Sequence, residues 1–367
     1  MEYRDLGKTG IKTSLLGFGG FHLLEITQKT VENLLNIYLD SGGNYIETAA
    51  SYGDGESERK IGMSVSKRRS EYILASKVSD RTKEGAMSQL EKSLRNLQTD
   101  YLDILFMHGV ASVEDLNIFI EGAYQAAIDA KKSGKIRFIA ASMHGFPGGL
   151  IAAVEHGGFD VIMTTINYFD HCNYPEIENT LLPMACKKNI GVMLMKPLAD
   201  GYLYKNTDKA FQYAFSKPVS VVVTGMNNEK MVTDNLYRIE NYTPMTTEEE
   251  NRLFTSAPEL SDYVCRKCGK CTCPNGTDII EIFRAEGYYD RQMARGIVDN
   301  TADYALMERL RFWYGNEDLG RRLYEELKKH GDSCNECSTC LSMCTYNIDI
   351  PKKLKIADYK LTGKSIY

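Results

Sequence analysis

The chain has 367 residues, of which 43% are hydrophobic and 25% are charged; these are ordinary values for a globular protein, and the length fits two domains. The net charge of −5 provides no electrostatic argument for binding a nucleic acid or an anionic membrane. No apolar run reaches the roughly 18 residues that span a bilayer, and the first residues lack a secretory signal pattern, so we expect a cytoplasmic protein.

The first dozen residues predict a hairpin with its turn at Gly7-Lys8-Thr9-Gly10. Continuous apolar runs follow, which are typical of parallel strands buried on both faces. We expect eight strands, at Leu15–Gly20, Asn44–Thr48, Tyr72–Val78, Tyr101–Gly109, Ile136–Met143, Val161–Tyr168, Gly191–Leu198 and Val219–Met226. Amphipathic stretches predict helices between them, among them Thr27–Asp40, Thr82–Leu97, Val113–Lys132, Pro175–Lys188 and Glu229–Arg238.

Eight strand–helix units over roughly 250 residues predict an α/β fold of the (β/α)8 TIM-barrel type. The alternative is a doubly wound sheet, whose first strand is typically followed by a Gly-x-Gly-x-x-Gly turn. The sequence Gly17-Phe18-Gly19-Gly20 does not supply that turn.

Polar side chains gather at the predicted ends of three neighbouring strands. Glu47 and Tyr52 follow the second strand, Lys77 lies in the third, and His108 ends the fourth. Each has a structural explanation on its own, because a tyrosine packs, a lysine pairs with a glutamate, and a histidine can be satisfied near a core. Since catalytic groups in such barrels occupy the carboxyl ends of the strands, the joint placement favours an active site.

The C-terminal third differs from the barrel region. A charged stretch, Thr246–Ser256, predicts a helix, and Pro258 marks a boundary, so we divide the chain into a barrel domain at 1–257 and a mostly helical domain at 258–367. Within the second domain, residues 279–331 predict a helical insert. Its acidic and basic charges balance, which we interpret as solvated, packed helices.

Eight of the ten cysteines fall into two runs that flank this insert. The first run is Cys265, Cys268, Cys271 and Cys273, and the second is Cys334, Cys337, Cys340 and Cys344. Three cysteines at x2 spacing, with Pro274 after the first run, favour two [4Fe–4S] clusters in a split ferredoxin-like motif. Zinc is the rival interpretation, because paired Cys-x2-Cys motifs also build zinc sites. The sequence departs from ferredoxin spacing between Cys271 and Cys273, and Thr345 replaces the second proline.

In ferredoxins the fourth cysteine of each run ligates the other cluster. The predicted ligand sets are therefore Cys265, Cys268, Cys271 and Cys344 for one cluster and Cys334, Cys337, Cys340 and Cys273 for the other. Cys172 and Cys186 lie in the barrel region, and we expect both to be buried small hydrophobes.

Residues 1–240 resemble an aldo/keto reductase. The resemblance rests on the opening Tyr3-Arg4-Asp5-Leu6-Gly7-Lys8-Thr9-Gly10, on Glu47-Thr48-Ala49-x-x-Tyr52-Gly53, where glutamate replaces the family's aspartate, and on Lys77 and His108. The cysteine-rich tail resembles the branch of the family that carries a ferredoxin-like 4Fe–4S extension.

This resemblance implies hydride transfer between a nicotinamide cofactor and a small-molecule carbonyl or alcohol. Tyr52 would be the general acid, with its pKa lowered by Lys77. Glu47 would hold Lys77 in place, and His108 would orient the carbonyl oxygen.

The resemblance also locates the cofactor. Its adenosine end would lie on the stretch Gly225–Asn235, where Asp234 and Asn235 match the family but Gly225, Met226 and Met231 replace its lysine, serine and arginine. A 2′-phosphate needs cations, so NAD(H) is favoured over NADP(H) unless Lys230 compensates.

The nicotinamide end departs further from the family. Its Ser-Asn pair is Ser142-Met143 here, and its stacking tyrosine appears as Met195. Polar partners for the carboxamide would then come from His144, Asn167 and Lys196. Gly19, at the end of the first strand, completes the residues that we assign to cofactor binding.

Three functions remain open at this point. The first is an oxidoreductase whose clusters pass electrons to or from a redox partner protein, with no nucleic-acid or membrane partner. The alternative is a ferredoxin-type electron carrier or partner-docking subunit on a barrel that has lost nicotinamide binding, as Met143, Met195, Met226 and Met231 suggest. The third is a reductase in which the cysteines bind structural zinc and no electron transfer takes place.

Overall fold

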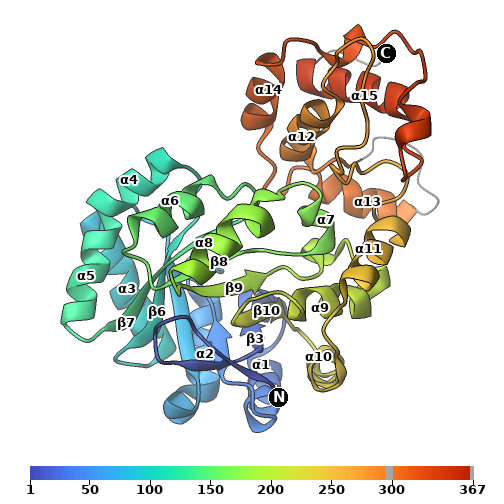
Figure 1. The fold of residues 1–367 in the computed structure, drawn as a ribbon. Helices are drawn as coiled ribbons and strands as arrows, with labels where there is room; N and C mark the ends of the chain where they lie inside the picture. Colours follow the sequence, from blue (N-terminus) through green and yellow to red (C-terminus); the bar gives the residue numbers. More distant parts are fainter. Residues whose placement is uncertain (294–300, 364–367) are drawn as a thin grey trace. The chain divides into compact units, whose positions relative to one another are not determined.

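The computed structural model describes residues 1–293 and 301–363, and its chain separates into two compact units. The first unit comprises Met1–Ile166, Glu176–Pro197 and Phe211–Pro244. The second comprises Asn167–Pro175, Leu198–Ala210 and Met245–Tyr367, so it includes two loops from the barrel region (Figure 1). The division at residue 257 stays a prediction, and residues 294–300 of the predicted insert lie outside the described residues.

The first unit is a closed barrel of eight parallel strands in the order β10-β3-β4-β5-β6-β7-β8-β9. Its strands are β3 (Leu16–Gly19), β4 (Tyr45–Glu47), β5 (Ile73–Val78), β6 (Leu102–His108), β7 (Ile136–Met143), β8 (Val161–Thr165), β9 (Gly191–Met195) and β10 (Val221–Gly225). The predicted (β/α)8 barrel is confirmed. All eight strands fall inside the predicted apolar runs, because both faces of each strand are covered.

Helices connect the strands around the barrel. They are α1 (Gln28–Asp40), α2 (Glu56–Val65), α3 (Lys83–Leu97), α4 (Val113–Glu121), α5 (Ala123–Lys132), α6 (Gly148–His156), α8 (Leu182–Lys187), α9 (Thr207–Phe215) and α10 (Glu229–Asn241). In α1, Val31, Leu34, Leu35 and Tyr38 are buried at helical spacing. Thr27 caps this helix by accepting from the backbone N–H of Thr30.

The predicted helix Val113–Lys132 is two helices rather than one. Gly122 separates α4 from α5 with φ −117° and ψ −91°. A Cβ at this position would lie 2.0 Å from the carbonyl oxygen of Arg81, so only glycine lets the chain pass here.

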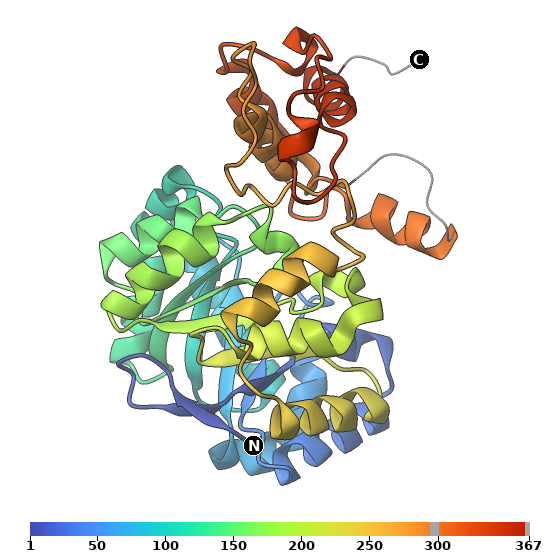
Figure 2. The ribbon, with the colours of Figure 1, turned by 45° about the vertical axis from the view of Figure 1, so that its right-hand side comes forward.

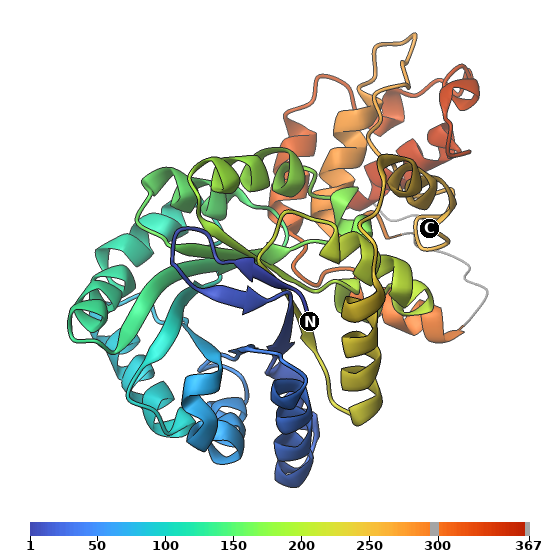
Figure 3. The same ribbon diagram turned by 60° about the horizontal axis from the view of Figure 1, so that its bottom comes forward.

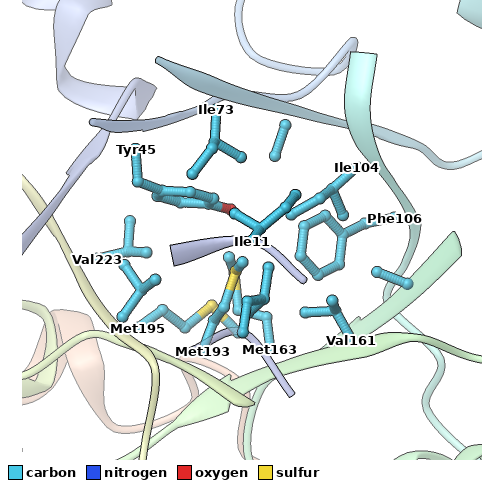
Figure 4. Packing of buried hydrophobic residues seen from close by; sticks show 14 residues of the cluster. Ile11, Tyr45, Ile73, Ile104, Phe106, Val161, Met163, Met193, Met195 and Val223 are labelled. Atoms are coloured by element: carbon cyan, nitrogen blue, oxygen red, sulfur yellow. The ribbon is translucent and has the colours of Figure 1, made fainter. Parts of the chain in front are cut away.

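The barrel interior is filled by inward-facing side chains (Figure 4). The cluster includes Tyr45, Ile73, Ala75, Ile104, Phe106, Ala140, Val161, Met163, Met193, Met195, Val221 and Val223. The hairpin of β1 (Tyr3–Asp5) and β2 (Lys12–Ser14), shown in dark blue in Figure 3, confirms the prediction for the N-terminus. Its turn adds Leu6 and Ile11 to the cluster, and Leu6 packs against Gly191 at the start of β9.

The second unit is mainly helical. It contains η4 (Ala199–Gly201), α7 (Tyr168–His171), α11 (Thr247–Ser256), α12 (Ile279–Asp290), α13 (Thr301–Leu310), α14 (Glu317–Glu325) and α15 (Ile350–Thr362). Helix α12 packs against both α14 and α15 (Figure 2). Cys340 belongs to the hydrophobic cluster between these helices, and both cysteine runs lie in loops beside it. No helix in the described part of the chain is long and apolar enough to cross a membrane.

The prediction of solvated charges in the insert is wrong for the face that α12 presents to α15. Glu286 and Asp290 are fully buried, and Lys360 of α15 lies 2.6 Å from the first carboxylate and 2.8 Å from the second. Lys353 lies 2.7 Å from the other oxygen of Glu286. Balanced charges therefore pair inside the unit rather than in solvent.

Candidate active site

Four side chains meet at the carboxyl ends of β4, β5 and β6. Glu47 is the last residue of β4, Lys77 is the second-last of β5, and His108 is the last of β6. Tyr52 lies in the turn between β4 and α2. The structure thus brings the four predicted catalytic residues together.

Lys77 is the centre of this group. Its Nζ donates to Tyr52 Oη at 3.1 Å, to the carbonyl oxygen of Thr48 at 2.9 Å, and to the carboxylate of Glu47. Lys77 is 2% exposed and Glu47 is 6% exposed. A buried ammonium has three N–H donors, and here each has an acceptor, so its orientation is fixed.

The pKa of Tyr52 is raised, because burial disfavours the phenolate more than the Lys77 cation stabilises it. Lys77 lowers this pKa as expected, but the larger effect of burial makes the net shift upward. Burial also opposes the charge of Lys77, but Glu47 and Tyr52 raise the pKa of this ammonium above its usual value. The site holds a neutral phenol beside a protonated amine.

Two rings flank the Tyr52 phenol. Phe21 approaches it edge-on with centroids 5.1 Å apart, and His108 does so at 6.1 Å. Burial and, to a smaller extent, the charges of Lys77 and Arg81 together lower the pKa of His108 to about 3. At neutral pH His108 is therefore a neutral imidazole, which offers one N–H donor and one acceptor.

The residues predicted for the nicotinamide end lie in different settings. Ser142 is paired in register with His108, is buried, and donates weakly to the carbonyl of Met107 at 3.4 Å. Asn167 lies beyond β8, where it caps α7 by accepting from the N–H of Asp170 at 2.8 Å. Met195 packs in the barrel core.

His144 and Lys196 follow strands β7 and β9 in the chain, and Lys196 has a left-handed backbone with φ +60°.

The residues predicted for the adenosine end lie around the end of β10. Gly225 pairs in register with Gly19 of β3, and a Cβ at Gly225 would lie 2.2 Å from the ring of His22. On α10, Asp234 bonds Lys230 at 2.7 Å, while Asn235 accepts from Arg238 at 2.9 Å.

The second unit holds a cavity lined by cysteines. Its four thiol residues, Cys265, Cys268, Cys271 and Cys344, are the first predicted ligand set. The empty space among these residues, which includes open solvent, is about 330 Å³, and Phe283, Ile348 and Ile350 supply apolar walls. Burial and, to a smaller extent, neighbouring thiols, among them the three other cysteines of this set, together raise the pKa of Cys271 to about 12.

The second predicted set is also gathered in space. Burial raises the pKa of Cys340, and the three thiols that add to this effect are Cys334, Cys273 and Cys337. Within residues 1–293 and 301–363, no group of three or more His, Cys, Asp or Glu side chains could hold a metal ion as it stands. The two clusters therefore stay a prediction.

Residues that the sequence did not reveal join the loop after β8 to the first cysteine run. Gln292 accepts from the N–H of Cys265 at 2.8 Å and donates to the carbonyl of Cys172 at 3.4 Å. Arg291 donates to Asp170 at 3.0 and 3.3 Å. No local pattern marks these residues, because their partners lie 27 positions away at Cys265 and about 120 positions away at Asp170 and Cys172. Cys172 is buried as expected, but the expectation for Cys186 is wrong, since it is exposed on α8.

Comparison with known proteins names the family. Residues 15–231 match the sequence profile described as "Aldo/keto reductase family". The chain belongs to the aldo/keto reductase family. It is therefore an oxidoreductase, and the resemblance of residues 1–240 is confirmed. The match ends before both cysteine runs, so it does not extend to the resemblance of the tail.

Individual aldo/keto reductase relatives agree with this assignment. L-galactose dehydrogenase of Arabidopsis thaliana is 28% identical over 302 residues, which are 68% of this chain and 92% of that protein. The structure of the aldo-keto reductase AKR11C1 from Bacillus halodurans, in its holo form, has a TM-score of 0.61 at 24% identity and covers 69% of this chain and 95% of that one.

An aldo-keto reductase from Klebsiella pneumoniae in complex with NADPH has a TM-score of 0.59 at 20% identity, over 69% of this chain and 95% of that one. At these identities the two structures support the barrel fold alone.

Proposed function

We propose that this chain is a cytoplasmic, nicotinamide-dependent oxidoreductase that interconverts a small-molecule carbonyl and its alcohol, and that its second unit carries two [4Fe–4S] clusters. The observation that carries the enzymatic part is the 3.1 Å bond from Lys77 Nζ to the neutral phenol of Tyr52, at the carboxyl end of the barrel. A phenol beside a fixed ammonium is suited to give up a proton.

The chain's own residues handle the proton. In the reducing direction Tyr52 donates its phenolic proton to the carbonyl oxygen, while Lys77 stabilises the phenolate that remains. Glu47 keeps Lys77 protonated and oriented, and the neutral His108 donates an N–H to the same carbonyl oxygen. A bound nicotinamide supplies the hydride.

The residues that we assign to the nicotinamide cofactor come from the carboxyl ends of barrel strands or from the segments that follow them in the chain. Ser142, Asn167 and Lys196 would hold the nicotinamide end, and Gly19, Gly225, Asp234 and Asn235 would hold the adenosine end. Gly225 lets the ring of His22 lie against the backbone at the end of β10, because a Cβ there would meet the ring at 2.2 Å. Because Lys230 is engaged by Asp234, NAD(H) is favoured over NADP(H).

The cysteine-lined cavity supports the iron–sulfur part of the proposal. Four thiols among apolar walls, with Arg266 and Lys270 nearby, suit a group whose ligands are thiolates. Such clusters supply single electrons, so a redox partner protein would exchange electrons with this unit. Iron and acid-labile sulfide assays of anaerobically purified protein test this part. About eight irons per chain supports it, and zinc without iron would contradict it.

Replacement of Tyr52 by phenylalanine tests the enzymatic part. We expect Tyr52→Phe to lower kcat for carbonyl reduction by about 10²–10⁴-fold, the usual contribution of a general acid, and to leave the Kd for the nucleotide unchanged. Tyr237→Phe is the control, because Tyr237 is 68% exposed on α10. A Tyr52→Phe enzyme with normal kcat would show that another group supplies the proton.

A further inference from the structure

A carboxylate that the reaction does not use faces the segment after β10. Glu25 ends η1 (Phe21–Glu25), the short helix that follows β3. Since β3 and β10 are paired with Gly19 opposite Gly225, η1 and the chain after Gly225 emerge side by side. Glu25 accepts from the side-chain amide of Asn227 at 2.7 Å, which fixes the carboxylate on this segment.

The other oxygen of Glu25 bonds the ring of His22 at 2.9 Å. This bond, together with that from Asn227, lowers the pKa of Glu25, so the group is ionised at neutral pH. The Glu25 side chain is also 48% exposed. A carboxylate has about four acceptor positions, and two hydrogen bonds leave capacity for a ligand.

Negative charge predominates on η1 and on the segment that follows β10. Residues 21–25 and 225–235 carry three carboxylates, Glu25, Glu229 and Asp234, against the single ammonium of Lys230. That ammonium is bonded to Asp234 one helical turn away. The 2′-phosphate of a bound dinucleotide would therefore meet carboxylates here. The two segments offer no lysine or arginine other than Lys230, which already pairs with Asp234.

We propose that Glu25 selects the cofactor by reading the 2′ position of the adenosine ribose. The carboxylate accepts a hydrogen bond from the 2′-hydroxyl of NAD(H) and repels the 2′-phosphate of NADP(H). Carboxylates serve the same purpose in other dinucleotide sites, because a hydroxyl can donate and a phosphate cannot. This inference rests on the proposed function, since it requires that a nicotinamide dinucleotide binds with its adenosine end on Gly225–Asn235.

Nucleotide affinity of the full-length chain, followed by NADH and NADPH fluorescence, tests the proposal. We expect the wild type to bind NADH more tightly than NADPH. Glu25→Gln should shrink the ratio of the two affinities by about tenfold, mainly through tighter NADPH binding, as expected for removal of one carboxylate near a phosphate. Raising the ionic strength should weaken the wild-type preference and leave that of Glu25→Gln nearly unchanged.

Glu71→Gln is the matched control, because Glu71 is 50% exposed in an ion pair with Arg68 and precedes β5, at the opposite end of the barrel. Its affinity ratio should equal that of the wild type. If NADH binds but Glu25→Gln changes the ratio no more than Glu71→Gln, the role of Glu25 is refuted while the proposed function stands. A wild type that prefers NADPH also refutes it. If neither nucleotide binds, the proposed function fails as well.

Discussion

Lys77 shows how a single side chain can set the chemistry of this site. Its three N–H groups bond Glu47, Tyr52 and the carbonyl of Thr48, and almost none of its surface is exposed. An ammonium in this setting is stable only while its carboxylate partner remains.

We therefore expect Glu47→Ala to lower the free energy of unfolding by about 3–5 kcal/mol, because it leaves the Lys77 charge buried without its ion-pair partner. The double variant Glu47→Leu with Lys77→Met should recover much of that loss, since it removes both charges. Urea unfolding of the wild type, Glu47→Leu, Lys77→Met and the double variant gives the coupling energy. Additive losses would show that the two residues do not act as a pair.

His108 should remain neutral far below the pH at which an ordinary histidine gains its proton. Its pKa lies at about 3, whereas an unperturbed histidine titrates near 6.5. In an NMR titration, the imidazole resonance of His108 is assigned by its disappearance in the His108→Gln variant. We expect this resonance of the wild type to keep its chemical shift between pH 8 and pH 5. A titration midpoint near 6.5 for that resonance would contradict the burial of the ring.

The low pKa of His108 also links protonation to stability. The unfolded chain takes up this proton below about pH 6.5, while the folded chain does so only near pH 3. His108 therefore does not lower the free energy of unfolding at neutral pH. As the pH falls from about 6.5 toward 3, the unfolded chain gains a proton that the folded protein does not, so the free energy of unfolding decreases. At pH 5 the loss is at most about 2 kcal/mol relative to neutral pH.

The meeting of Glu47, Tyr52, Lys77 and His108 could be predicted from the sequence because strand ends are visible as breaks in apolar runs, while their catalytic roles stay a prediction. The direction of the Tyr52 pKa could not, since it depends on how much water the folded barrel excludes. Glu25 was also missed. Its role depends on the pairing of β3 with β10, which brings together residues 202 positions apart.

At the scale of elements, apolar runs located all eight strands but extended three residues beyond the carboxyl ends of β8 and β9. β8 stops at Thr165 because Asn167 begins a short helix, although Ile166 and Tyr168 continue the apolar pattern. β9 stops at Met195, where Lys196 adopts a left-handed conformation. A helix cap or a left-handed residue can end a strand within an apolar run, and the pattern of hydrophobicity does not predict either of them.

The break between α4 and α5 leads to a prediction about packing. Gly122→Ala should lower the free energy of unfolding by about 1–3 kcal/mol or more, because the new Cβ would lie 2.0 Å from the Arg81 carbonyl oxygen. The control is Gly134→Ala, where φ is +77° and no atom lies within 4 Å. That change should cost only about 1 kcal/mol of backbone strain. Equal losses for the two variants would contradict the steric explanation.

At the scale of the whole molecule, the loop Asn167–Pro175 leaves the barrel strands and groups with the second unit. Asp170 is 1% exposed and accepts from Arg291, which is fully buried, and from Tyr314 at 2.8 Å. The sequence predicted two domains in succession. It could not predict this interleaving, because the charges that join the loop to the second unit have no local pattern.

We expect Arg291→Met to lower the free energy of unfolding by about 3–5 kcal/mol, because it leaves the carboxylate of Asp170 buried without a cation. Arg252→Met is the matched control, since Arg252 pairs with Glu248 on α11 and is 65% exposed. That variant should stay within about 0.5 kcal/mol of the wild type. Denaturant titrations compare the two, and a loss below about 1 kcal/mol for Arg291→Met would show that the buried pair contributes little.

The interleaving of the two units also affects how the protein is made. Arg291, at the end of α12, follows Asp170 by 121 residues. At synthesis rates of roughly 5–20 residues per second, a ribosome needs about 6–24 s to cover that distance. The last two strands, β9 and β10, are translated within this interval, while the loop after β8 still lacks its buried cation. The second unit therefore cannot complete its buried ion pair between Arg291 and Asp170 until α12 has been synthesised, so its folding must follow that of its own first loop by this interval.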